Sequence, residues 1–147
     1  MTIARVLAPL MLVLPLKPAL AVEEDGYDLW LRYRPLSGAY RAHVQSRARA
    51  IVHPANPSLT TLAAVAELHR GLTGMLGAEP PVRSTLVDGA VVLATPESLP
   101  AIASLSLPLS KLGSEGYLIR SVKMNGHKVT LIAANSDIGA LYGAFAW

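Results

Sequence analysis

The sequence feature that most constrains the fold is the Asn125-Gly126 dipeptide, which separates two stretches of alternating apolar residues. Asn followed by Gly favours a two-residue type I′ turn, because both central residues of that turn need a positive φ. A hairpin centred there has a definite register, which pairs Leu118 with Ala133, Ile119 with Ile132, Ser121 with Thr130, Val122 with Val129 and Lys123 with Lys128. We therefore expect a hairpin with an exposed tip and a buried base.

A helix is expected directly after this hairpin. Asn135, Ser136 and Asp137 are favoured N-cap residues, and a cap is the best explanation of Asp137. Apolar side chains then recur at helical spacing and predict one stripe that faces the sheet, formed by Ile138, Leu141, Tyr142 and Phe145. No stop signal precedes Trp147, which indicates that the chain is the front part of a longer polypeptide.

The rest of the chain alternates strands and helices. Apolar runs predict strands at residues 50–53 and 89–95, the second of them covered on both faces. A helix is predicted from an N-cap at Ser58 to about Leu76, with Gly77 as its stop and a Glu67–Arg70 pair on its wet side. The buried stripe of this helix is expected to comprise Leu62, Val65, Leu68, Leu72, Met75 and Leu76.

Weaker patterns complete the fold prediction. Residues 39–51 suggest a loose helical face formed by Tyr40, His43, Val44 and Arg47. Residues 97–105 suggest a short helix, and residues 108–113 suggest a loop. Trp30, Leu31 and Tyr33 suggest an edge strand or an extended segment. The order predicts an α/β (α+β) fold, in which helices pack on a mixed β-sheet that contains the Asn-Gly hairpin.

The first 21 residues have the pattern of a signal peptide. Arg5 precedes a mostly apolar run, and the small residues Ala19 and Ala21 fit a cleavage site after Ala21. A membrane anchor would need about 20 consecutive apolar residues, and this run is shorter and broken by prolines and Lys17. We therefore expect a periplasmic or secreted protein without a stable membrane anchor, whose mature chain forms one domain over residues 22–147.

Composition narrows the possible functions. Loss of Arg5 and Lys17 with the signal peptide lowers the formal net charge from +3 to +1, so the basic balance does not indicate nucleic-acid binding. The local arginine series is better explained as a solvated face, and comprises Arg32, Arg34, Arg41, Arg47 and Arg49. The chain has no cysteine, so an exported domain of this kind must depend on its packed core instead of disulfides.

No residue of the chain is assigned a catalytic, cofactor-binding or metal-binding role. The four histidines, His43, His53, His69 and His127, lack metal-ligand spacing. No nucleophile elbow is present, and Gly71, Gly74 and Gly77 fall at the end of a helix, whereas a phosphate-binding loop opens one. The carboxylates Glu23, Glu24, Asp25, Asp28, Glu115 and Asp137 form no convincing catalytic pair.

Two stretches nevertheless resemble one enzyme family. Residues 24–35, EDGYDLWLRYRP, resemble the start of the mature α-glucuronidases of glycoside hydrolase family 67. Residues 113–145 are similar to the end of that family's N-terminal domain, with GSEGYLIRSV, the hairpin and the SDIGALYGAF segment. Ala94 departs from the Gly expected before Thr95-Pro96.

The resemblance implies an inverting, cofactor-free enzyme that removes glucuronic acid or its 4-O-methyl ether from xylo-oligosaccharides. The catalytic carboxylates of that family lie in a (β/α)8 barrel, which is expected downstream of this non-catalytic domain and is absent here. The domain is expected to pack against that barrel and orient it, to be inactive alone, and to meet substrate only through it. Two alternatives stay open: a carbohydrate-binding or scaffold domain using Trp30, Tyr33 and Tyr40, and the front domain of a β-hexosaminidase.

Overall fold

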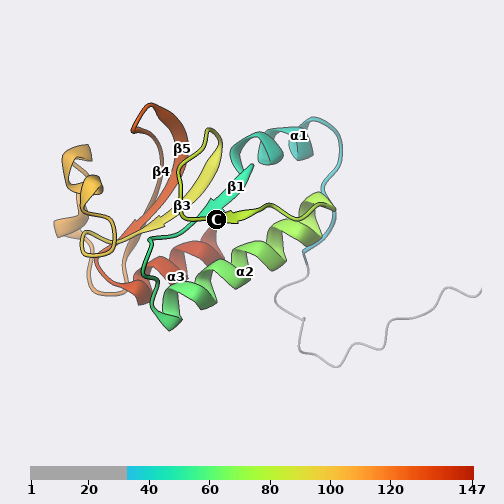
Figure 1. The fold of residues 1–147 in the computed structure, drawn as a ribbon. Helices are drawn as coiled ribbons and strands as arrows, with labels where there is room; N and C mark the ends of the chain where they lie inside the picture. The colour runs from blue at the N-terminus through green and yellow to red at the C-terminus, as the bar shows by residue number, and fades with distance from the viewer. Residues whose placement is uncertain (1–32) are drawn as a thin grey trace, which may run out of the picture. The chain divides into compact units, whose positions relative to one another are not determined.

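Five strands form one mixed sheet in residues 33–147, the part of the chain that the computed structural model describes (Figure 1). Their order across the sheet is β2-β1-β3-β5-β4. The strands are β1 (Ala50–Val52), β2 (Val82–Arg83), β3 (Ala90–Ala94), β4 (Tyr117–Met124) and β5 (His127–Ala134). β1 runs parallel to both β2 and β3, and β3 runs parallel to β5, whereas β4 is antiparallel to β5. The predicted α/β (α+β) class, with helices packed on a mixed sheet, is confirmed. The predictions for residues 1–32, which include the signal peptide and the segment around Trp30, lie outside the described residues.

Helices cover one face of this sheet and 3-10 turns cover the other. The α-helices are α1 (Gly38–Arg47), α2 (Leu59–Leu76) and α3 (Asp137–Ala146). Figure 1 shows α2 and α3 side by side below the sheet. The opposite face carries η1 (Pro100–Leu105) and η2 (Leu109–Lys111), which bury Ile102 and Leu109 against β3 and β5. None of the helices in this described part is long and apolar enough to cross a membrane.

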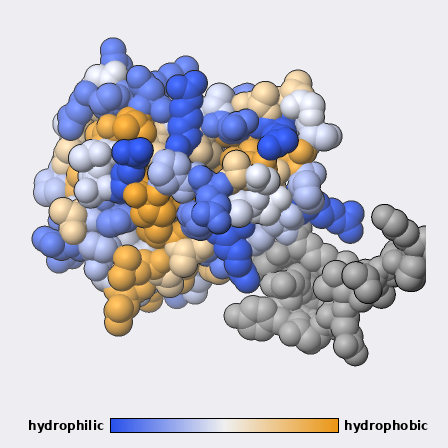
Figure 2. Space-filling view, turned by 45° about the vertical axis from the view of Figure 1, so that its right-hand side comes forward, coloured by the Kyte–Doolittle hydropathy of each residue, from blue (hydrophilic) through white to orange (hydrophobic). Residues whose placement is uncertain are grey.

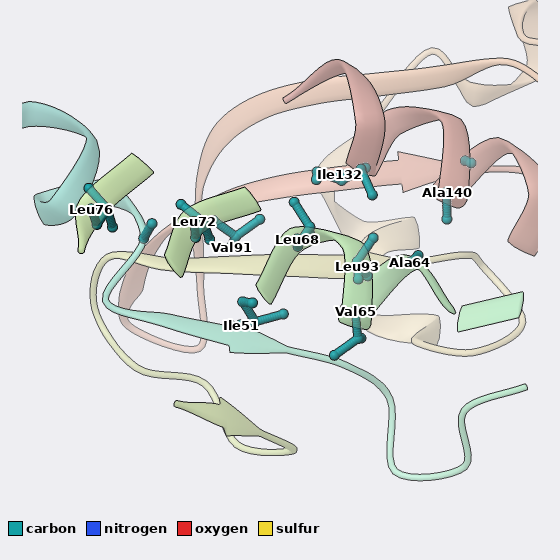
Figure 3. Close-up of a cluster of buried hydrophobic side chains, with 13 residues drawn as sticks. Ile51, Ala64, Val65, Leu68, Leu72, Leu76, Val91, Leu93, Ile132 and Ala140 are labelled. Carbon is teal, nitrogen blue, oxygen red and sulfur yellow. The ribbon is translucent and has the colours of Figure 1, made fainter. Parts of the chain in front are cut away.

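The main core lies between α2 and the central strands. Figure 3 shows Val65, Leu68 and Leu72 of α2 pointing toward Ile51 of β1 and Val91 of β3. The predicted α2 stripe is correct for Val65, Leu68, Leu72 and Leu76, which are all buried. It is wrong for Leu62, which is largely exposed, while Met75 is half-buried. Thr61 and Ala64 complete the buried face instead, while Gly71 is buried against Tyr33.

The predicted ends of α2 and the central strand are also present. The Ser58 hydroxyl accepts a hydrogen bond from the Thr61 backbone N–H at 3.1 Å, and Gly77 ends the helix in a left-handed conformation. All five residues of β3 are buried between the two core layers, as the uninterrupted apolar run predicts. The short helix predicted within residues 97–105 is present as the 3-10 helix η1. The structure adds β2, which was not predicted, and η2, which falls in the segment predicted as a loop.

The chain reverses between β4 and β5 at Asn125-Gly126. Asn125 has φ +47° and Gly126 has φ +88°, which are the positive values that a type I′ turn requires. Val122 pairs with Val129 across the hairpin, and Lys123 pairs with Lys128 beside the exposed turn. Most of β5 is buried, whereas β4 forms the edge of the sheet and is largely exposed.

The predicted orientation of the last helix is wrong. Its large apolar residues Ile138, Tyr142 and Phe145 are 49%, 44% and 51% exposed, and Leu141 is half-buried. The buried face of α3 consists of small residues instead, namely Gly139, Ala140, Gly143 and Ala144. Steric fit explains why α3 turns its small residues toward the sheet, because even a Cβ at Gly143 would lie 2.5 Å from Cγ2 of Ile132 on β5.

The N-cap of α3 is Ser136 and not Asp137. The Ser136 hydroxyl accepts a hydrogen bond from the Gly139 backbone N–H at 3.2 Å and donates one to the Ser114 carbonyl. Asp137 is the first helical residue, and its carboxylate accepts a hydrogen bond from the Ser58 hydroxyl at the start of α2. This bond joins the N-termini of the two helices, so α2 and α3 begin at the same edge of the sheet.

Candidate functional site

The titratable residues considered at the sequence level are dispersed over the described fold. His43 lies on α1 with Nε2 3.4 Å from Nη1 of Arg47, and His53 follows β1 with Nδ1 2.7 Å from the Pro54 carbonyl oxygen. His69 is half-buried on α2, while Nδ1 of His127 lies 3.8 Å from Oδ1 of Asp88. In residues 33–147 no group of three or more His, Asp or Glu side chains could hold a metal ion. Glu115 is exposed in a turn before β4, and Glu23, Glu24, Asp25 and Asp28 lie outside the described residues.

One polar cluster on α2 has a structural explanation. Glu67 accepts a hydrogen bond from the Tyr33 hydroxyl and forms the predicted ion pair with Arg70 at 3.0 Å. Burial raises the pKa of Tyr33 to about 12, with the Glu67 hydrogen bond and charge acting in the same direction. Gly71 and Gly74 make room for this tyrosine, since a Cβ on either would lie within 2.9 Å of it. These glycines therefore serve helix packing and not phosphate binding.

A groove between α1 and the β4–β5 hairpin is the strongest candidate for a binding site. It consists of two adjoining hollows of about 540 Å³ and 330 Å³ that share His43, Arg47, Ser121 and Thr130. We call the whole depression the α1 groove. Its larger hollow is lined by the cationic residues Arg47, Arg49 and Lys128, and its smaller hollow by Tyr40, Met75, Ile119 and Trp147. The groove therefore has a cationic end and an apolar end.

Hydrogen bonds hold the walls of the α1 groove together. Nη2 of Arg47 donates to the Ser121 hydroxyl and so joins α1 to β4. The Arg49 backbone N–H donates to the Gly89 carbonyl at 2.9 Å, and the Gly89 N–H donates to the Lys128 carbonyl at 2.8 Å. Gly89 has φ +75°, and a Cβ there would lie 2.4 Å from the Ser46 carbonyl oxygen. Only glycine fits this contact, which fixes the turn after α1 against β3 and β5.

Asp88 is the carboxylate that lines the cationic end. Its Oδ1 accepts a hydrogen bond from the Lys128 backbone N–H at 2.8 Å. This bond lowers the pKa of the Asp88 carboxyl below its usual value, and the nearby His127 and Arg49 act in the same direction, against a smaller opposing effect of desolvation. The cationic end is thus lined by three basic side chains, Arg47, Arg49 and Lys128, and by one carboxylate, Asp88.

Sequence patterns identified one wall of the groove and missed the other. The helical face predicted from Tyr40, His43, Val44 and Arg47 is the face of α1 that lines it. Arg47 and Arg49 are exposed, as predicted for a solvated face, but they converge on a hollow. Lys128 and Thr130 were not identified as site residues from the sequence. The signal that could have indicated them is their two-residue spacing on β5, which places both side chains on the same face of the sheet.

A second surface feature is a set of exposed apolar side chains on α2 and α3, which we call the α2–α3 apolar surface. It comprises Leu59, Leu62, Ile138, Tyr142 and Phe145. Leu59 and Ile138 directly follow Ser58 and Asp137, whose hydrogen bond joins the two helices. Figure 2 shows apolar side chains exposed on the lower side of the molecule, where Figure 1 places α2 and α3. Exposed apolar residues grouped in this way are typical of a contact surface.

Comparison with known proteins gives the family. Residues 29–147 match the family model described as the glycosyl hydrolase family 67 N-terminus. The chain is 32% identical over 145 residues to an alpha-glucuronidase of Hypocrea jecorina, and 30% identical over 142 residues to a probable alpha-glucuronidase A of Aspergillus terreus. These alignments cover 94% and 95% of this chain but only 16% of each relative. A probable alpha-glucuronidase A of Aspergillus fumigatus is 29% identical over 132 residues, with 87% and 15% of the two chains covered. The chain therefore belongs to glycosyl hydrolase family 67, and its described fold is that of the family's N-terminal domain.

Proposed function

We propose that this chain is the N-terminal domain of an exported α-glucuronidase that removes glucuronic acid or its 4-O-methyl ether from xylo-oligosaccharides during xylan breakdown. The family match over residues 29–147 is the observation that carries the proposal. The relatives that cover this chain are named as alpha-glucuronidases, and most of their length lies beyond the matched part. In this proposal the hydrolysis takes place in a downstream (β/α)8 barrel of the same polypeptide.

The two carboxylates of an inverting mechanism are assigned to that barrel. Inverting hydrolysis needs a general acid and a general base about 6.5–9.5 Å apart, with a water molecule between the base and the sugar. Three of the six carboxylates in residues 33–147 have structural partners: Glu67 is bonded to Tyr33 and Arg70, Asp88 to the Lys128 backbone, and Asp137 to Ser58. The other three, Glu79, Glu97 and Glu115, are exposed. The contacts of the first three support a non-catalytic role for the domain.

The role of this domain is to orient the barrel through the α2–α3 apolar surface. Large apolar side chains that are half exposed in the domain gain about 25 cal/mol for each Å² of apolar area that a partner covers. The occupant is the downstream barrel, since the relatives extend far beyond the part that this chain matches. Phe145 lies in the last turn of α3 and brings this surface closest to the end of the matched segment.

The experiment compares the 147-residue chain with the polypeptide extended downstream to the length of its relatives. The extended polypeptide should release glucuronic acid from glucuronosyl-xylo-oligosaccharides, and early proton NMR spectra should show the inverted anomer. The 147-residue chain should release none. Release of uronic acid by the short chain, or none by a folded extended polypeptide, would refute the proposal.

The docking surface is tested in the same extended polypeptide. Phe145→Asp should lower its melting temperature and its activity, because the variant places a charge in the contact with the barrel. Val82→Asp is the matched control, since Val82 is similarly exposed on β2 and far from α3 in the sheet order. Equal effects of the two substitutions would exclude the α2–α3 apolar surface as the contact.

The export part of the proposal depends on the N-terminal sequence pattern alone. Arg5, the apolar run and the small residues at Ala19 and Ala21 support a signal peptide that is cleaved after Ala21. Protein recovered from the periplasm or the medium should begin at Val22 when its N-terminus is sequenced. An intact N-terminus on active protein retained in the cytoplasm would contradict this part.

A further inference from the structure

We propose that the larger hollow of the α1 groove binds a tetrahedral oxyanion, namely a phosphate or sulfate group. The ligand is the free ion or a small molecule that carries the group as an ester, and both are recognised by the same chemistry. This inference goes beyond the proposed function, because it concerns one hollow between α1, β4 and β5 and requires neither a sugar nor hydrolysis.

Three basic side chains converge on this hollow from different parts of the fold. Arg47 ends α1, Arg49 lies just before β1 and Lys128 lies on β5, and all three line a volume of about 540 Å³. Asp88 lines the hollow too, but its Oδ1 already accepts a hydrogen bond from the Lys128 backbone N–H at 2.8 Å. Because the basic side chains outnumber this carboxylate, the hollow attracts anions, and a doubly charged anion more strongly than a singly charged one.

A buried hydroxyl group in the same hollow is available to a ligand. Thr130 is only 5% exposed and lines the hollow. Every fully enclosed polar side-chain atom of residues 33–147 has a hydrogen-bond partner. The Thr130 hydroxyl has no partner among these residues, so it is not fully enclosed and opens into the hollow. A hydroxyl buried without a hydrogen bond is costly, and an oxygen of a bound oxyanion would accept one from Thr130.

The directions of the donors favour a tetrahedral anion over a planar one. Ser121 and Thr130 are paired residues of β4 and β5, so their hydroxyl groups lie on the same face of the sheet. Ser121 accepts a hydrogen bond from Nη2 of Arg47 and can still donate its own hydroxyl hydrogen. The hydroxyl groups therefore approach from the sheet and the arginines from α1 and the residues after it. A phosphate or sulfate group has oxygens in both directions, whereas the two oxygens of a carboxylate lie in one plane.

The hollow is formed before any ligand enters. The Arg49 N–H donates to the Gly89 carbonyl at 2.9 Å, and the Gly89 N–H donates to the Lys128 carbonyl at 2.8 Å. The Arg49 side chain also packs over this glycine, since a Cβ at Gly89 would lie 3.0 Å from its Cδ. These contacts hold two of the three basic residues in place. A preformed site loses less conformational entropy on binding than one that its ligand must order.

The test is an NMR titration of the ¹⁵N-labelled 147-residue chain at constant ionic strength and about pH 8, where a phosphate group carries close to two negative charges. The ligands are inorganic phosphate, sulfate, phenyl phosphate, acetate and glucuronate. The tighter of phosphate and sulfate should bind at least about tenfold more tightly than acetate or glucuronate. The largest amide shifts should fall on Arg49, Ser121 and Lys128.

The same titration identifies the source of the group. Tighter binding of phenyl phosphate than of inorganic phosphate would indicate an ester, and the opposite order or equal affinity would indicate the free ion. The readout is binding without turnover, so failure of the proposed glucuronidase activity would leave it unchanged.

The hydroxyl contribution is tested by Thr130→Val. This variant should weaken binding of the anion about tenfold without lowering the urea midpoint, because the lost hydroxyl has no protein partner. Thr61→Val is the matched control. Thr61 is equally buried, but its hydroxyl accepts a hydrogen bond from Ser58 at 3.2 Å and lies outside the hollow. Thr61→Val should lower the urea midpoint and leave anion binding unchanged.

The charge contribution is tested by the double variant Arg49→Gln with Lys128→Gln, which should weaken binding about tenfold or more. Arg83→Gln is its control, since Arg83 is exposed on β2 outside the hollow. Circular dichroism checks that each variant is folded. Four results would overturn the inference: no binding of phosphate or sulfate at about 10 mM, equal affinity for acetate or glucuronate, unchanged affinity in Thr130→Val, and equal losses in Arg83→Gln and the double variant.

Discussion

The buried face of α3 yields a prediction that can be worked out from contact distances. Gly143 lies against β5, and a Cβ added there would be 2.5 Å from Cγ2 of Ile132 and 3.2 Å from Cβ of Tyr117. The substitution Gly143→Ala therefore introduces a methyl group where no space exists. It also replaces glycine by the best helix former, so two opposing effects must be compared.

The magnitudes of these effects decide the expected sign. Ala in place of Gly within a helix stabilises it by about 1 kcal/mol, whereas overpacking a core costs about 1–3 kcal/mol. Gly143→Ala should therefore lower the free energy of unfolding by about 0–2 kcal/mol. In an Ile132→Ala background the nearest contact is removed, and the same substitution should become stabilising by up to about 1 kcal/mol. The coupling energy between the two positions is then about 1–3 kcal/mol.

Urea unfolding of the four variants of this double-mutant cycle measures the coupling. Ile132→Val provides the matched control, because valine keeps both branches at Cβ and so retains the methyl group that contacts position 143. The cycle with Ile132→Val should show little coupling. A coupling below about 0.5 kcal/mol in the Ile132→Ala cycle, or equal coupling in both cycles, would refute the steric explanation of how α3 is oriented.

Three further predictions concern other contacts. Ser136→Ala should lower the free energy of unfolding by about 1 kcal/mol in urea titrations, because it removes the cap on the Gly139 N–H, and an unchanged value would contradict the cap. Gly89→Ala should cost about 2 kcal/mol or more in the same assay, since it combines a left-handed φ with a clash against the Ser46 carbonyl, and a neutral result would refute this contact. The raised pKa of Tyr33, about 12 against 10.0, gives stability that is fully present below pH 10 and lost as the pH rises toward 12. The difference in unfolding free energy between the unchanged chain and Tyr33→Phe should therefore shrink over that interval, and a constant difference would contradict the assignment.

Local sequence rules described the elements of this fold better than their orientation. The β-branched run at residues 89–95 and the capped segment from Ser58 predict β3 and α2, because both signals depend on residues close together in the sequence. The orientation of α3 depends instead on how near its backbone can approach Ile132 and Tyr117. Hydrophobic periodicity predicts that Tyr142 and Phe145 are core residues. It does not show how much space the sheet leaves, and here only glycine and alanine fit against it.

The α1 groove could be anticipated only in part for the same reason. Tyr40, His43 and Arg47 share a helical face that is readable from their spacing. Lys128 and Thr130 reach the groove because β5 lies beside β3 and the turn after α1 is held against both by Gly89. No short-range pattern links Arg49 with Lys128, since the contact between their segments is created by the sheet.

The position of β4 has a consequence for how this domain meets other chains. Within residues 33–147 it is the terminal strand of the sheet, so every second backbone N–H and C=O along its eight residues points away from β5 without a strand neighbour. Such a border can template the addition of a foreign strand. Arg120 and Lys123 are exposed along it. Charged side chains on an edge strand disfavour the addition of another strand, so these two cations protect this border from unintended pairing.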